Sequence, residues 1–187
     1  DAECTMTGGT SMAGALATGL VASLMEVPED QCLEAWPEAV RAIVMNSASN
    51  IDGSNWPSTI ANNVDGKDGT GKVHADRAYL MANKWAGYCD EGSKEEITAD
   101  APHGYATGIY YDGDDDDEEN RYVYLEATTS SMRVTLSWSS DPEKALNDLD
   151  LYVYKLEGPT WVLKGVSDTT TNPVEVVEIT GGEGDYV

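Results

Sequence analysis

The sequence predicts a helical α/β unit followed by an all-β antiparallel unit. Before about residue 94, apolar residues recur at helical spacing and Ala is frequent, whereas apolar and polar residues alternate after it. The charge changes at the same point, since residues 1–94 hold 6 basic and 13 acidic side chains and residues 95–187 hold 5 and 21. We therefore assign the first unit to residues 1–92 and the second to residues 93–187.

Three helices are predicted in the first unit. Residues 11–25 carry large apolar residues about four apart with small residues between them, a pattern typical of a helix buried on nearly all sides. The second helix begins at Pro37, because Pro is favoured at the first helical position, and ends near residues 46–49. The third spans residues 74–83, after a loop at 50–72 that is rich in Gly, Asn and Asp. The apolar stripe of the second helix consists of Ala39, Val40, Ile43 and Val44.

The second unit is predicted to contain a series of short strands. Each strand is bounded by Gly, Pro, Asp or Asn, and short strands at this spacing indicate a sandwich or barrel. A further strand begins near the end of the chain, within residues 184–187. The predicted strands are residues 122–128, 133–139, 149–154, 161–164 and 174–180.

The formal net charge of −23 argues against two classes of partner. Nucleic-acid phosphates and anionic membrane surfaces both attract Lys and Arg, which are scarce in this chain. No stretch reaches the roughly 18 consecutive apolar residues of a membrane span. We expect a monomer with no nucleic-acid partner and no membrane partner, whose 41% hydrophobic residues suffice for a core.

The two ends of the sequence and its three cysteines bear on whether the chain is a fragment and whether it is secreted. The N-terminus has neither an initiator Met nor the basic and apolar regions of a signal peptide, and the C-terminus stops in a strand-like pattern, so we interpret the sequence as a fragment. Cys4, Cys32 and Cys89 lie too far apart for a C-x-x-C motif. They are either free thiols or one disulfide with one thiol left over, and the second alternative would fit secretion.

The segment Thr7-Gly8-Gly9-Thr10-Ser11-Met12-Ala13 directly precedes and opens the first predicted helix. A serine there lies at the positive end of the helix dipole, and its backbone N–H has no intrahelical partner and can stabilise an oxyanion. The preceding glycines allow the substrate backbone to approach closely. The alternative is a helix N-cap, the commonest role of Ser or Thr before a helix.

Three blocks of the first unit resemble, in order, segments of the subtilisin-like serine proteases (subtilases). Gly9-Thr10-Ser11-Met12-Ala13 resembles the nucleophile segment of that family. Residues 37–48 (PEAVRAIVMNSA) resemble the next helix, and residues 69–78 (GTGKVHADRA) resemble the closing Gly-x-Gly-x-Val turn and helix. The resemblance implies that residues 1–92 are the C-terminal part of a subtilisin-like α/β peptidase domain. Ala15 stands where the family usually has Pro, and Ala is itself a strong helix former.

The resemblance also implies roles for individual residues. Ser11 would be the nucleophile of a serine endopeptidase acting on polypeptide substrates, with its N–H, Gly9 and Thr10 contributing to the oxyanion and substrate site. The family's general-base His, its orienting Asp and its oxyanion Asn precede the Ser in chain order, so we expect them upstream of residue 1 and expect this fragment alone to be inactive. His74 and His103 are interpreted as structural or surface residues. No cofactor is expected for catalysis, and a decayed, non-catalytic scaffold is the alternative.

The second unit resembles the jelly-roll-like β-sandwich that follows the catalytic domain in one bacterial subtilase branch. The similar segments are residues 133–139 (RVTLSWS), 147–153 (NDLDLYV), 172–177 (NPVEVV) and 184–187 (GDYV). The resemblance implies a secreted, extracellular protein whose sandwich is truncated at its last strand.

Acidic residues suggest one candidate metal site. Asp148 and Asp150 are predicted at positions i and i+2 of a strand, where like charges on one face are costly unless they are paired or metal-bound. Because subtilases with this sandwich commonly bind structural calcium, the resemblance implies a calcium site that uses one or both; the alternative is edge carboxylates bonded to turn amides. The acidic run at 112–119 is interpreted as a solvated hairpin loop. A calcium-dependent binding or stabilising β-module on a decayed protease scaffold is therefore the alternative function.

Overall fold

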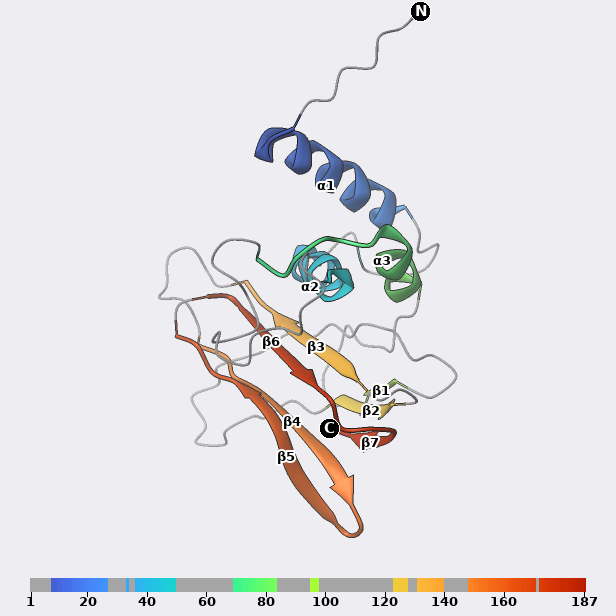
Figure 1. Cartoon of the computed structure of the whole chain (residues 1–187), viewed down its shortest axis with the longest axis vertical. Helices are drawn as coiled ribbons and strands as arrows, with labels where there is room; N and C mark the ends of the chain where they lie inside the picture. Colours follow the sequence, from blue (N-terminus) through green and yellow to red (C-terminus); the bar gives the residue numbers. More distant parts are fainter. Residues whose placement is uncertain are drawn as a thin grey trace, which may run out of the picture.

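The computed structural model describes residues 8–26, 33, 36–49, 69–83, 95–97, 123–127, 131–139, 148–170 and 172–187. Within these residues, three helices, α1 (Thr10–Met25), α2 (Pro37–Ser47) and α3 (Ala75–Ala82), precede seven strands. Figure 1 shows the helices gathered at one end of the molecule and the strands at the other. Among the described residues, none of the helices is long and apolar enough to cross a membrane.

The three predicted helices are confirmed, with ends close to the predicted ones. The predicted stripe of α2 is also confirmed, since Ala39, Val40 and Ile43 are buried and Val44 packs against them. These side chains form one hydrophobic cluster with the end of α1 and with the inner face of α3. The other buried members of the cluster are Leu24, Leu33, Ala78, Met81 and Ala82.

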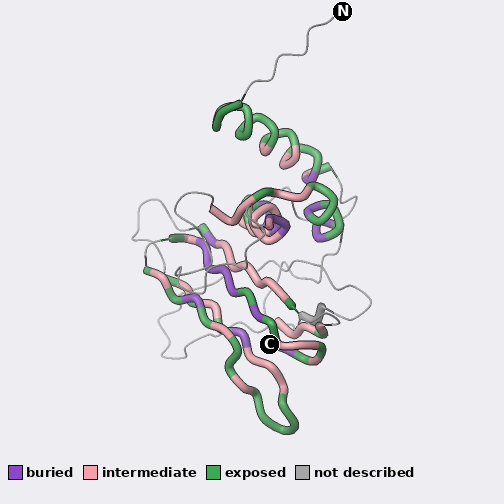
Figure 2. Tube along the Cα trace, viewed as in Figure 1, coloured by how far each residue is buried: buried purple, intermediate pink, exposed green. Residues whose placement is uncertain are grey.

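The prediction that α1 is buried on nearly all sides is wrong. Leu24 is its only buried residue, while Met12 is 47% and Leu16 is 76% exposed. Figure 2 shows the exposed surface running along most of the helix. The apolar residues of α1 are distributed around the helix instead of forming one stripe. This distribution predicts packing contacts on every side of the helix, but most of the helix is exposed. Among the described residues, α2 and α3 pack against its C-terminal half alone, from Leu20 onward.

The strands form two sheets. The five-stranded sheet has the order β1-β2-β7-β4-β5, and the two-stranded sheet pairs β3 with β6. The sheets pack against each other through a cluster that includes Val153, Val177, Ile179 and Tyr186. The strands are β1 (Glu95–Ile97), β2 (Val123–Ala127), β3 (Met132–Ser137), β4 (Leu151–Glu157), β5 (Thr160–Ser167), β6 (Val174–Ile179) and β7 (Gly184–Tyr186).

Two details of the strands differ from the prediction. β1 was not predicted, because three residues are too few for an alternating pattern to be recognised, and it pairs with β2 in parallel, so the second unit is not wholly antiparallel. β5 continues beyond the predicted end at residue 164, through Gly165. A Cβ atom at Gly165 would clash with Val177 Cγ1, so this glycine permits close approach to β6 and does not end the strand. The jelly-roll-like connectivity and the boundary at residues 92 and 93 stay predictions.

The helices and the sheets meet where α2 packs on β3 (Figure 1). The alternation of β3 directs Met132 and Val134 toward the hydrophobic cluster between the sheets. The intervening residues direct polar side chains to α2: Arg133 Nη1 donates to the Ala48 carbonyl oxygen, and Thr135 Oγ1 donates to Asn46 Oδ1 at 3.1 Å. This interface between the two units is therefore polar.

Candidate active site

Ser11 lies in the first turn of α1, one residue after the helix begins. The helix follows Gly9, whose φ of 140° and ψ of 162° belong to a region that glycine adopts and side chains disfavour. The N–H groups of Met12 and Ala13 both donate to the Gly9 carbonyl oxygen at 3.1 Å. The amide of Ser11 precedes them and is one of the first-turn N–H groups that an α-helix leaves without an intrahelical partner.

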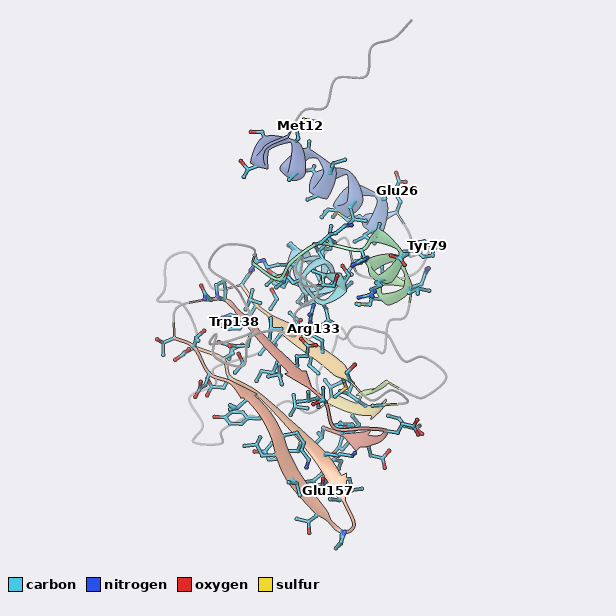
Figure 3. All side chains as sticks on the ribbon, viewed as in Figure 1. Met12, Glu26, Tyr79, Arg133, Trp138 and Glu157 are labelled. Carbon is cyan, nitrogen blue, oxygen red and sulfur yellow. The ribbon has the colours of Figure 1, made fainter. Side chains whose placement is uncertain are left out.

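The hydroxyl of Ser11 does not cap the helix. The N-cap position is occupied by Gly9, and no side-chain cap hydrogen bond forms there. Residues 8–16 are all exposed, and Figure 3 shows the end of α1 near Met12 directed away from the rest of the described helices. The alternative interpretation of Ser11 as an N-cap is therefore wrong, and Gly9, Thr10 and Ser11 together form an accessible helix start.

His74 lies far along the chain, immediately before α3. Its Nε2 is 2.6 Å from Ser49 Oγ, and the backbone of Ser49 in turn exchanges hydrogen bonds of 2.9 and 2.7 Å with Lys72. These contacts join the loop before α3 to the chain just after α2. They support the structural interpretation of His74, because its ring is bonded to a serine other than Ser11. His103 lies outside the described residues.

Asp148 and Asp150 precede β4, which begins at Leu151, so the prediction that they share one face of a strand is wrong. Both are exposed, and Asp150 Oδ2 accepts a hydrogen bond of 3.4 Å from the Tyr152 hydroxyl. Within the described ranges, no group of three or more His, Cys, Asp or Glu side chains could hold a metal ion. The calcium site stays a prediction, and the acidic run at 112–119 lies outside the described residues.

Glu175 is a buried polar residue that the sequence interpretation missed. It is fully buried on β6, where its carboxylate accepts hydrogen bonds from Ser167 Oγ and from Thr169, through the backbone N at 2.9 Å and Oγ1 at 2.8 Å. These bonds join the end of β5 to the start of β6. The available signal was one carboxylate within the apolar run Val174-Glu175-Val176-Val177, because a charge in a buried strand requires partners.

The described part of the first unit presents an accessible serine in the first turn of α1, followed by the packed pair α2 and α3. Comparison with protein families finds that residues 2–88 match the Subtilase family model, which supports a serine-protease-type scaffold. The matched segment contains α1, α2 and α3, and the match ends before β1. Searches of curated proteins and of solved structures found no match.

Proposed function

We propose that the protein is a serine endopeptidase of subtilisin type in which Ser11 is the nucleophile. The observation that carries the proposal is the position of Ser11. It lies within the family-matched segment, in the first turn of α1, with an exposed hydroxyl that takes no part in capping. Gly9 and Thr10 precede it on the same accessible surface, where the backbone of a substrate could lie.

The chemistry follows from this placement. Ser11 Oγ attacks the carbonyl carbon of a peptide bond while a base removes its proton, and the carbonyl oxygen becomes an oxyanion that accepts a hydrogen bond from the Ser11 N–H. The positive end of the α1 dipole stabilises the same charge. The C–N bond then breaks as the amine takes up the proton, and water hydrolyses the acyl-enzyme ester to regenerate the serine.

The base is not one of the two histidines of this sequence. Both follow Ser11 in the chain, whereas the resemblance places the base, its orienting Asp and the oxyanion Asn before the nucleophile. His74 is also engaged by Ser49. The proposal therefore assigns the base, its orienting Asp and the oxyanion Asn to residues upstream of residue 1. We also propose that the protein is secreted, that its substrates are polypeptides and that catalysis requires no cofactor.

Active-site labelling of the full-length protein with a fluorophosphonate tests the nucleophile. Labelling is expected to disappear in Ser11→Ala, since the phosphonyl group requires that hydroxyl. The matched control is Ser23→Ala, because Ser23 is an exposed serine on the same helix whose Oγ donates to the Gly19 carbonyl oxygen at 3.1 Å. Labelling that persists in Ser11→Ala, or that is lost equally in Ser23→Ala, would contradict the assignment.

The second candidate function is a stabilising β-module, favoured by the polar contact of β3 with α2. In its calcium-dependent form, Asp148 or Asp150 would contribute ligands, because calcium takes carboxylate oxygens. Thermal unfolding with and without a chelator tests that form. A fall in the melting temperature that Asp148→Asn abolishes supports it, and a melting temperature unchanged by the chelator rejects it.

A further inference from the structure

The outer face of the β4–β5 hairpin carries a row of aromatic and aliphatic side chains that are exposed or half-buried. Three cross-strand pairs form it, and the register shift after Val153 keeps all three on the same face. Its most exposed members range from 39% exposed at Trp161 to 48% exposed at Leu163. We call this surface the hairpin strip, defined by the pairs Tyr152 with Val166, Tyr154 with Leu163 and Leu156 with Trp161.

The opposite face of the same hairpin is packed. Val153 is 2% exposed in the cluster between the sheets, and Gly165 lies against β6. The strip is therefore the outer face of the five-stranded sheet, and the Trp161 ring extends it toward Tyr124 of β2, with centroids 6.3 Å apart. Figure 1 shows the hairpin projecting beyond the other strands, with Glu157 labelled near its tip in Figure 3.

The charges around the hairpin strip favour the binding of a cationic group. Lys164 Nζ is 2.5 Å from Glu157 Oε1, and Lys155 on the inner side donates to the Gly181 carbonyl oxygen, so the two hairpin lysines are engaged. Near Tyr152 the charges are carboxylates. The Asp150 carboxylate raises the pKa of the Tyr152 hydroxyl above its usual value, with smaller contributions that include Asp168. An aromatic surface with negative charge at one end attracts ammonium and guanidinium groups.

We propose that the hairpin strip is a docking surface for an extended polypeptide that carries Lys or Arg side chains. Within the described strands, β5 is the last strand of its sheet, so its outer edge can accept an added strand through main-chain hydrogen bonds. The outward side chains of β5, which include Trp161 and Leu163, would then contact side chains on one face of the added strand, and the carboxylates near Tyr152 would attract the basic ones. This inference rests on the proposed function, because it assigns a basic substrate class to that protease.

Two other occupants fit the charges less well. A second copy of the chain would bring together two units that each hold 21 acidic and 5 basic residues over 95–187, and like charges across an interface are strongly unfavourable. A neutral polysaccharide could stack on the aromatic rings but would not use the carboxylates near Tyr152. Both occupants are outcomes that the experiment distinguishes.

Fluorescence anisotropy with the full chain carrying Ser11→Ala tests the proposal, because this variant cannot cleave the probe. The probes are a labelled peptide of alternating Lys and Thr and a matched peptide of alternating Glu and Thr. The Lys peptide is expected to bind, more weakly as salt is added, and the Glu peptide is not. Trp161→Ala should weaken binding about two- to fivefold, as expected for one exposed cation–π contact. The control is Tyr79→Ala, an aromatic residue 51% exposed on α3, which should bind as the parent does.

A charge pair at Leu163 keeps the test valid if Trp161→Ala fails to fold. Leu163→Glu should strengthen binding of the Lys peptide, and Leu163→Lys should weaken it, since Leu163 is exposed in the middle of the strip. Equal binding of both peptides, self-association, or preferential binding of a neutral glucan oligosaccharide would overturn the proposal. If the Lys peptide does not bind while the parent protein is still labelled at Ser11 by the fluorophosphonate, only the docking surface is rejected. If the Lys peptide binds but the parent protein is not labelled, only the protease assignment is rejected.

Discussion

α1 and α2 are both apolar helices of the family-matched segment, but they use their apolar residues differently. α2 concentrates them in one stripe, and the stripe is buried against α1 and α3. α1 distributes them around the helix, and all of its residues before Ala17 are exposed. The comparison indicates that the apolar stripe of α2 contributes stability through its contacts with α1 and α3, whereas the N-terminal part of α1 is exposed and contributes little to this cluster.

β4 repeats the same contrast within one strand. Its inward residue Val153 is 2% exposed, whereas the adjacent outward residue Tyr152 is 46% exposed. In both places the buried residues belong to a cluster and the exposed ones adjoin a proposed site. Stability and binding therefore depend on different side chains, and single substitutions can separate the two.

The largest expected effect is a core truncation in α2. Ile43 is 2% exposed, so Ile43→Ala should lower the free energy of unfolding by about 2–5 kcal/mol through lost burial and a cavity. Leu16→Ala in α1 removes a similar side chain that is 76% exposed, and it should change stability by less than about 0.5 kcal/mol. Urea unfolding of the full chain measures both variants, and equal losses would abolish the contrast between the helices.

A smaller effect is expected where α2 meets β3. Arg133 donates to the Ala48 carbonyl oxygen and lies 3.4 Å from Glu178, and burial lowers the pKa of Arg133 while Glu178 partly offsets the shift. Arg133→Met leaves the buried carbonyl of Ala48 without this donor, so stability should fall by about 1–3 kcal/mol. The control is Arg41→Met, an exposed arginine of α2, for which a change below about 0.5 kcal/mol is expected.

The unfolding profile of Arg133→Met carries further information. If the polar interface couples the two units, the variant should separate one thermal transition into two, because each unit has its own hydrophobic cluster. A single transition at an unchanged temperature would show that the contacts of Arg133 contribute nothing to the coupling.

Sequence patterns predicted the positions of the helices and strands better than the burial and the contacts of their side chains. The helices and most strands follow from periodicity and from residues such as Pro37, because these signals are local. The exposure of α1 could not be predicted, since burial depends on which elements lie nearby and not on the helix itself. The position of Ser11 within a family segment could be predicted from the neighbouring residues. The hydrogen bonds of the buried Glu175 could not, because they depend on Thr169, which lies in the connection between β5 and β6. Asp148 and Asp150 were misplaced because β4 begins after them.

The smallest expected effect concerns the outer face of β4 and is electrostatic. The pKa of Tyr152 is raised above its usual value, chiefly by the Asp150 carboxylate, because a second negative charge beside it is unfavourable. The unfolded chain therefore loses this proton at a lower pH, about 10, so this contribution to stability is complete below that pH and is lost as the pH rises through the folded pKa. In Asp150→Asn the pKa should move back toward its usual value and the alkaline loss should diminish. Phenolate absorbance during alkaline titration measures the shift, and subtracting the Tyr152→Phe titration isolates one of the 10 tyrosines. Asp185→Asn on β7 is the control, and an equal shift there would mean that net charge, not the neighbouring carboxylate, governs this face.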